Sequence, residues 1–275
     1  MSNGIVKCKF YGRYGNQLFT YFIARIFAEK NKLNLISRID NKIFIIKENI
    51  NYGINPKNLT TIIRDNNSRN NLLSYEGKAN YIFNGHFQWE SYFYFHKNMI
   101  LNWINPVIDI DRNKKIIIHI RLDDFLNDYQ NLVINVDYYI YCVKKYCQNY
   151  KEITILCDKI RKKWEQDYIK ELIQKLKELN KNVIYRNNNI HKDMADIINS
   201  DTLICSNSTF CFWGMFFSDS KKIIKFPYTG YSITKKSKLE IGFTTPELFK
   251  FEDEFNIVEK EFSGDIKKYF MRKYY

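Results

Sequence analysis

The sequence is poor in the residues that interrupt helices and strands, with only 10 Gly and 4 Pro among 275 residues. It has no apolar run of the ~20 residues that a membrane-spanning helix requires, and residues 1–4 do not begin a signal peptide. The 6 Cys form no Cys-x-x-Cys pair, and most lie in apolar stretches typical of reduced core cysteines. These absences predict a cytoplasmic protein.

Signatures of several functional classes are missing as well. There is no His/Cys cluster for zinc and no Gly-x-Ser-x-Gly turn of a hydrolase. The 43 Lys and Arg against 30 Asp and Glu give a net charge of +13, which favours an anionic partner. Because zinc-finger spacings and a long basic arm are absent, we expect no nucleic acid. The basic C-terminal tail, 267–273, leaves open a peripheral membrane contact.

Strands and helices alternate regularly in the second half of the chain. Such alternation specifies right-handed βαβ units and a parallel sheet covered on both faces. The predicted strands are 116–120, 153–157, 183–185, 203–205 and 223–226, and the predicted helices are 137–149, 162–179, 194–199 and 209–218.

The first half opens with a strand at 5–10, a turn, and a helix at 16–32 with one apolar stripe. Short strands follow at 33–36 and 44–46, whereas 49–71 is rich in Asn and has no readable pattern. The length suggests two domains. The interruption around Pro106 divides the chain into domains 1–108 and 109–275.

The stretch from Ile116 to Asp124 is the first site candidate, because an apolar strand ends there in His119, Arg121 and Asp124. Ligands of parallel α/β sheets gather beyond the carboxyl ends of the strands. The planar fork of an arginine fits phosphate oxygens two at a time. The pattern predicts a diphosphate ligand, and a structural salt bridge between Arg121 and Asp124 is the alternative.

Two turns that precede helices are further candidates for anion binding. At 12–17, Arg13 adds a full charge to the amides of a helix start, with a tight turn capped by Asn16 as the alternative. At 205–210, Ser208 and Thr209 begin a helix and offer hydroxyls and free amides to an anion. The alternative is an ordinary capped helix that binds no ligand. Neither turn has the Gly-x-Gly-x-x-Gly signature of dinucleotide binding.

Four acidic residues are candidate ligands. Asp158 follows the predicted strand 153–157, and Asp193 stands at the start of a short predicted helix. Carboxylates at such strand ends can accept hydrogen bonds from ribose hydroxyls or a guanine edge, and helix capping is the alternative for both. Asp109 and Asp111 form a short Asp-x-Asp pair of the kind that holds Mg²⁺ or Mn²⁺ against a diphosphate. Because hard cations need more converging oxygens than this pair offers, we expect no metal.

Four segments in order along the chain carry motifs of one family. They are GRYGNQLFTYFIAR at 12–25, GHFQWESYF at 85–93, HIRLDD at 119–124 and SNSTFCFW at 206–213. Together they resemble the α-1,2-fucosyltransferases, a family (family 11 type) of GDP-fucose-dependent glycosyltransferases. The third segment departs from the family's His-x-Arg-Arg-x-Asp, with Leu122 in place of the second Arg and Asp123 where glycine is usual.

The resemblance implies an α/β, GT-B-like protein whose two Rossmann-like domains face a central cleft, with an inverting, metal-independent reaction and no cofactor. The N-terminal domain would lie on the acceptor side, and the C-terminal domain would bind the nucleotide-sugar. It also implies the site. Arg121 and Asp124 would act at the catalytic centre, and the donor would be bound by Arg13, Asn16, His119, Asp158, Asp193, Asn207, Ser208 and Thr209.

In this picture Arg121 clamps the β-phosphate, Ser208 and Thr209 bind phosphate, and His119 and Asp193 face the guanine. The expected function is transfer of L-fucose from GDP-L-fucose to a glycan hydroxyl, the 2-OH of a β-galactoside. Two alternatives stay open: Leu122 marks a donor that is another nucleotide-deoxysugar, or the chain is a glycan- or nucleotide-binding module without turnover.

Overall fold

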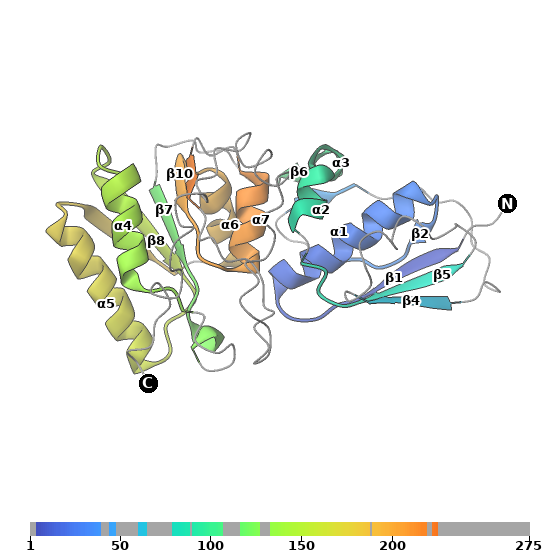
Figure 1. Cartoon of the computed structure of the whole chain (residues 1–275), viewed down its shortest axis with the longest axis horizontal. Helices are drawn as coiled ribbons and strands as arrows, with labels where there is room; N and C mark the ends of the chain where they lie inside the picture. Colours follow the sequence, from blue (N-terminus) through green and yellow to red (C-terminus); the bar gives the residue numbers. More distant parts are fainter. Residues whose placement is uncertain are drawn as a thin grey trace. The chain divides into compact units, whose positions relative to one another are not determined.

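The structure is a computed structural model that describes residues 4–39, 44–47, 60–64, 79–88, 90–106, 116–126, 133–187, 189–218 and 222–224. The chain divides into two compact units, 1–108 and 109–275, which are described separately (Figure 1). The boundary predicted from the sequence falls at the same position. The roles assigned to the two domains stay predictions.

Unit 1 is built on a parallel sheet with the strand order β2-β1-β5-β4. Helix α1 lies along one face of this sheet (Figure 1), and its Phe27 ring packs 4.9 Å from Tyr81 and 5.3 Å from Phe83. Strands β3 and β6 form a separate antiparallel pair. The elements are β1 (Ile5–Lys9), α1 (Tyr14–Lys30), β2 (Asn34–Leu35), β3 (Phe44–Ile46), β4 (Thr60–Arg64), β5 (Asn80–Asn84), α2 (Glu90–Phe95), α3 (Lys97–Asn102) and β6 (Ile104–Pro106).

Unit 2 is built on a parallel sheet with the strand order β11-β10-β7-β8-β9. The chain runs outward from β7 to β9, then returns to the other side of β7 for β10 and β11. The order therefore reverses between β7 and β10, which is where doubly wound sheets bind ligands. The elements are β7 (Ile116–Ile120), α4 (Val136–Tyr146), β8 (Glu152–Cys157), α5 (Lys163–Glu178), β9 (Asn182–Arg186), α6 (Ile190–Ile198), β10 (Thr202–Ile204), α7 (Thr209–Phe217) and β11 (Lys222–Ile224).

The central strand of unit 2 explains why this sheet forms. All five residues of β7 are buried, because α4 and α5 cover one face and α6 and α7 the other (Figure 1). A strand buried on both faces requires the continuous apolar run that the sequence has at 116–118. Helices α6 and α7 approach closely, since a Cβ placed on Gly214 would lie 2.3 Å from Ile197 Cγ2.

The predicted α/β alternation of unit 2 is confirmed, and two predicted helix starts need correction, one in each unit. Helix α1 begins at Tyr14 and has Arg13 at its N-cap, so Asn16 is not the cap. Helix α6 begins at Ile190, four residues before the predicted start, because the side chain of Asn189 accepts from the amides of residues 191 and 192. Within the described residues no helix is both long and apolar enough to cross a bilayer.

Candidate functional site

The guanidinium of Arg121 lies at the carboxyl end of β7, between two carboxylates. Its Nη1 donates to Asp158, which follows β8, and its Nη2 donates to Asp124, which lies in a short turn of 3-10 helix at 123–125. The Phe125 ring centroid is 5.1 Å from the Arg121 Cζ. Arg121 is 10% exposed, Asp124 19% and Asp158 50%. The ion pair that the sequence analysis kept as an alternative is therefore present.

The two ion pairs fix the plane of the Arg121 guanidinium, and they also neutralise its positive charge. One positive charge faces two negative charges, so a diphosphate gains little attraction unless a carboxylate moves away. Asp158 is suited to move because half of its side chain is exposed and its ion pair is weakened by water. The guanidinium has five N–H donors, so it can keep Asp124 while it donates to a phosphate.

The two departures from the family motif have structural explanations. Leu122 is 2% exposed and belongs to the hydrophobic core of unit 2, so its side chain does not enter the carboxyl edge of the sheet. Asp123 has φ of 53°, in the left-handed region that favours glycine and that Asp tolerates better than most residues. Position 123 therefore keeps the backbone conformation that a glycine would adopt.

His119 connects β7 to the turn between β10 and α7. Its side chain is buried, its Nδ1 lies 2.7 Å from Ser206 Oγ, and its ring centroid lies 5.9 Å from that of Phe210. Burial disfavours the imidazolium, but the Cys211 thiolate, Asp158 and Asp193 raise the pKa of His119 above its usual value. Burial likewise opposes the thiolate, but a hydrogen bond from Cys205 and the charge of His119 lower the pKa of Cys211 to about 5.

The turn that precedes α7 has the predicted helix start. Ser208 is the N-cap, and its Oγ accepts from the Phe210 amide at 3.2 Å, so the capped-helix alternative is present. Thr209 is the first residue of the nine-residue helix, and both Asn207 and Thr209 are half-buried. The turn and Arg121 lie at the carboxyl ends of neighbouring strands, on either side of the reversal in strand order.

Asp158 and Asp193 are not helix caps. The N-cap of α5 is Lys162 and that of α6 is Asn189, which leaves Asp193 in the first turn of α6, half-buried. The charges of both carboxylates raise the pKa of His119. The structure therefore brings together eight of the ten predicted site residues in unit 2: His119, Arg121, Asp124, Asp158, Asp193, Asn207, Ser208 and Thr209.

The other two predicted residues, Arg13 and Asn16, lie in unit 1 at the carboxyl edge of its own sheet. Arg13 is exposed and its side chain makes no capping bond at the start of α1. Asn16 Oδ1 accepts from Gln88 Nε2 at 3.0 Å, which joins the first family segment to the second. Gly12 precedes them with φ of 66°, and a Cβ there would lie 2.3 Å from Asn16 Nδ2.

Next to this pair, Tyr11 OH donates to Asn84 Oδ1 at 2.7 Å, and the rings of Tyr11 and the exposed His86 lie 6.0 Å apart. Tyr11 and His86 follow β1 and β5, neighbouring parallel strands, and Asn84 is the last residue of β5. The sequence analysis gave none of Tyr11, Asn84, His86 or Gln88 a role. The signal that could have found them is the position of two family segments directly after apolar strands.

Ser206, Phe210 and Cys211 were also missed as parts of the site in unit 2. The sequence predicts Cys211 to be a reduced core cysteine, and it is indeed a free, buried thiol, but its interaction with His119 was not predicted. Asp109 and Asp111, and the basic C-terminal tail, lie outside the described residues. Among the residues that the structure does describe, no three His, Cys, Asp or Glu side chains are grouped to hold a metal ion.

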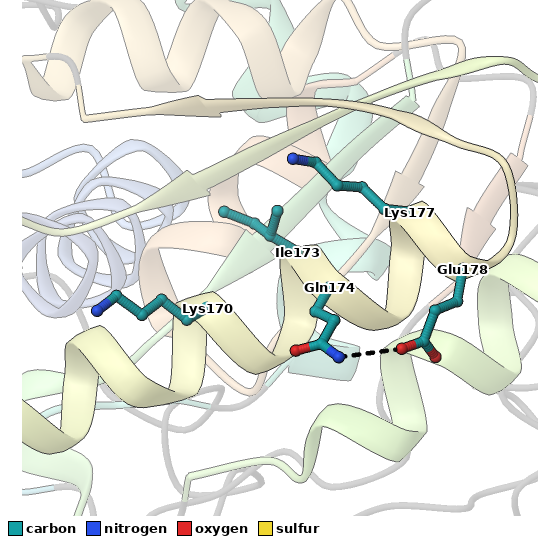
Figure 2. Close-up of a pocket in the computed structure, with 5 residues that line it drawn as sticks. All are labelled: Lys170, Ile173, Gln174, Lys177 and Glu178. Carbon is teal, nitrogen blue, oxygen red and sulfur yellow. Dashed lines mark hydrogen bonds between the residues drawn. The ribbon is translucent and has the colours of Figure 1, made fainter.

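A cavity of about 600 Å³ lies elsewhere, along one face of α5 (Figure 2). Its lining residues all come from this helix, and Gln174 Nε2 donates to Glu178 Oε1 at 3.2 Å. Because α5 runs back from the carboxyl end of β8, this part of the helix lies toward the opposite edge of the sheet from Arg121. The lining residues are Lys170, Ile173, Gln174, Lys177 and Glu178.

Comparison with known proteins establishes the fold. No family model and no curated protein matches the chain. Among solved structures, a mutant of Arabidopsis thaliana FUT1 in complex with GDP superposes with a TM-score of 0.50 and 10% identity, over 84% of this chain and 71% of that one. The expected GT-B-like α/β fold is thereby confirmed.

Two further solved structures are more distant. An apo structure of OtsA matches with a TM-score of 0.30 and 14% identity, over 42% of this chain and 29% of that one. A structure described as trehalose-6-phosphate from E. coli bound with UDP-2-fluoro glucose matches with a TM-score of 0.36 and 12% identity, over 70% of this chain and 50% of that one.

Proposed function

We propose that the protein is a glycosyltransferase that moves L-fucose from GDP-L-fucose to a glycan hydroxyl, the 2-OH of a β-galactoside, with inversion and without a metal. The observation that carries the proposal is Arg121 at the reversal point of the unit 2 sheet, beside the turn at 206–209. The likeness of the fold to GDP-bound FUT1 and the four family segments support the same conclusion.

The reaction places negative charge on the departing GDP. The acceptor oxygen attacks the anomeric carbon of fucose, the bond from that carbon to the β-phosphate oxygen breaks, and the acceptor releases its proton. Donors fixed around the leaving oxygen stabilise this transition state more than the substrate. In our proposal Arg121 donates to the β-phosphate and the start of α7 binds phosphate through Ser208 and Thr209.

Asp124 then holds Arg121 in position, and Asp158 exchanges its ion pair for a ribose hydroxyl when the diphosphate arrives. This exchange frees the Nη1 of Arg121 to donate to the diphosphate. Asn207 completes the phosphate turn, and Asp193 lies on the guanine side. The diphosphate of the donor thus takes the place of the Asp158 carboxylate at Arg121, and it carries more negative charge than that carboxylate.

Unit 1 takes the acceptor side in this proposal. Its carboxyl edge offers amide, hydroxyl and aromatic groups, which suit a neutral sugar better than a diphosphate. The glycan is recognised by hydrogen bonds and ring contacts rather than by charge.

A second candidate is a transferase of the same fold with another nucleotide-deoxysugar donor, which Leu122 favours because no arginine stands at that position. The two candidates differ in the base that they bind. Isothermal titration calorimetry with GDP, UDP and dTDP therefore separates them. Preference for GDP supports the first, and preference for either of the others replaces it.

Transfer itself is tested with purified protein, GDP-L-fucose and a β-galactoside, with the product identified by mass spectrometry and NMR. We expect an α-1,2-linked fucoside, and equal rates with and without EDTA. Nucleotide binding without transfer or donor hydrolysis would show instead a binding module that has lost turnover. Strong inhibition by EDTA would contradict the metal-independent reaction and make Asp109 and Asp111 metal-ligand candidates.

A further inference from the structure

His119 is in contact with three residues of the junction between β10 and α7. Ser206 Oγ lies 2.7 Å from its Nδ1, the Phe210 ring is inclined by 35° over its ring, and Cys211 hydrogen-bonds to it. Ser206 is the first residue of the turn at 206–209, and Cys211 follows this turn in the first turn of α7. One side chain of β7 therefore connects to both sides of the turn.

The contacts of His119 are with buried groups. Ser206 is 6% exposed, His119 7% and Cys211 0%. A buried polar group that loses its hydrogen-bond partner stays unsatisfied, because water cannot reach it to replace that partner. The position of the turn at 206–209 relative to β7 therefore depends on the hydrogen bonds that the His119 ring nitrogens make.

This arrangement leaves His119 little surface for a nucleotide. A guanine edge would have to compete with Ser206 for Nδ1 and with Cys211 for the remaining donor of the ring. The predicted direct contact of His119 with guanine is therefore harder to reconcile with the geometry than an action through the turn. The turn is also the segment that, in the proposed function, binds the diphosphate.

We propose that His119 is a positioning residue for diphosphate binding, which holds the turn at 206–209 in register with Arg121 through Ser206 and Cys211. The inference rests on the proposed function for the identity of the ligand. It assigns to His119 a role through protein atoms rather than through nucleotide contact. The charged groups that act on His119 are Cys211, Asp158 and Asp193, and their electrostatic effect favours the imidazolium that donates from both nitrogens.

The test compares two substitutions of one residue. His119→Asn keeps an amide near the position of Nδ1 and so keeps the bond to Ser206, whereas His119→Phe keeps the ring and loses the bond. We expect His119→Phe to weaken binding of GDP at least about tenfold, the loss typical of one hydrogen bond to a charged group, and His119→Asn to stay within about threefold of wild type. Binding is measured by calorimetry after circular dichroism has shown that each variant is folded.

Ser206→Ala removes the partner instead of the histidine and serves if His119→Phe does not fold. It should weaken GDP binding to a similar extent. Ser218→Ala is the matched control, because Ser218 is also a buried serine whose hydroxyl binds within unit 2, to the carbonyl of residue 198 at 2.9 Å. The control should bind GDP as wild type does.

NMR gives a readout that loss of structure alone would not produce. The chain has only 4 His, so ¹⁵N-histidine labelling resolves the ring nitrogens of His119. We expect its Nδ1 signal to shift in Ser206→Ala and not in Ser218→Ala. GDP should shift it in wild type as the turn binds phosphate.

The outcomes separate this inference from the proposed function. If wild type prefers UDP or dTDP, the proposed donor is wrong, and the same variants are compared with that nucleotide. If folded His119→Phe and Ser206→Ala bind the nucleotide as tightly as wild type, the inference is overturned while the proposed function stands. If wild type binds none of the three diphosphates, both are overturned.

Discussion

The carboxyl edges of the two sheets carry opposite kinds of chemistry. In unit 2 the edge is charged: Arg121 lies between Asp124 and Asp158, and His119 pairs with Cys211 below the turn. In unit 1 the described side-chain contacts join neutral groups, with two hydrogen bonds between amide or phenol side chains and one pair of rings, and Arg13 is an exposed cation beside them. Similar parallel sheets thus present different surfaces at equivalent positions.

The difference follows from what each edge is proposed to bind. A diphosphate needs a fixed cation and amide donors, which a folded protein holds in place by pairing the cation with carboxylates. A glycan hydroxyl carries no charge, so amides, phenols and rings suffice and can remain half-exposed. The comparison therefore predicts that variants of unit 2 affect the donor and variants of unit 1 affect the acceptor.

The largest effect is expected for Arg121→Ala. It removes the cation and leaves Asp124 and Asp158 to repel the diphosphate, and each hydrogen bond lost to a charged group costs about 1.5–3 kcal/mol. GDP binding should fall at least about a hundredfold and transfer should be lost, with the fold intact by circular dichroism. Lys170→Ala is the control, because it removes one exposed cation on α5 and should change neither measurement.

Retained transfer in Arg121→Ala would remove the central residue of the proposed mechanism. Loss of the fold would instead favour the structural salt bridge between Arg121 and Asp124. Arg121→Lys distinguishes these results further, since lysine restores the charge but not the planar fork. We expect it to fold normally and to bind GDP more weakly than wild type.

Gly214→Ala tests whether the charged edge depends on the packing beneath it. The added methyl would lie 2.3 Å from Ile197 Cγ2, so α6 and α7 must separate. Overpacking of this kind costs about 1–3 kcal/mol. Urea unfolding should show a loss of that size, and hydrogen exchange should increase in unit 2 but not in unit 1. Ala195→Gly, at a half-buried position of α6, measures helix propensity without overpacking, and its loss of about 1 kcal/mol gives the size of the propensity that Gly214→Ala gains against the overpacking.

Gln88→Ala tests the neutral edge. It removes the donor to Asn16 in the segment that follows β5, and a neutral hydrogen bond is worth about 1 kcal/mol. The KM for the acceptor should rise about fivefold, while the affinity for GDP stays at the wild-type value. A change in GDP affinity without a change in acceptor KM would reverse the roles of the two units.

The sequence was informative where structure is local. The apolar run at 116–118 predicted a strand buried on both faces, and the helices of unit 2 followed from spacing along the chain. Strand β4 was missed because it lies within the Asn-rich stretch 49–71, which has no regular alternation of polar and apolar residues. Helix α6 was predicted four residues short because its cap, Asn189, stands in a run of asparagines.

From the sequence, only the site residues that directly follow predicted strands could be identified. Arg121, Asp158 and Ser208 each follow a strand, so their convergence follows from a parallel sheet. The contact of His119 with Ser206 joins residues 87 positions apart, and the bond of Tyr11 to Asn84 joins residues 73 positions apart. Such contacts depend on strand order and register, which spacing along the chain does not encode.

The smallest effect is the pH dependence of the free energy of unfolding that arises from the pair of His119 and Cys211. The described residues of unit 1 contain no such His–Cys pair. The folded unit lowers the pKa of Cys211 from 9.0 to about 5 and raises that of His119 above 6.5. Between pH 5 and 6.5, His119 is protonated in both states, while Cys211 keeps its proton only in the unfolded chain. The unfolded state then binds one more proton, so the free energy of unfolding rises with pH.

Above pH 6.5 the two contributions oppose each other. The contribution of His119 is full below 6.5 and is lost as the pH rises through its raised pKa in the folded unit, whereas that of Cys211 still increases toward pH 9. The stability curve of wild type should therefore rise from pH 5 to 6.5 and then level off. Urea unfolding of Cys211→Ser should lack this rise, and that of Cys142→Ser, a buried thiol in α4, should keep it. If the free energy of unfolding rises equally with pH between 5 and 6.5 in Cys211→Ser and wild type, the pair of His119 and Cys211 is uncharged. The charged groups of the unit 2 edge would then not include this pair.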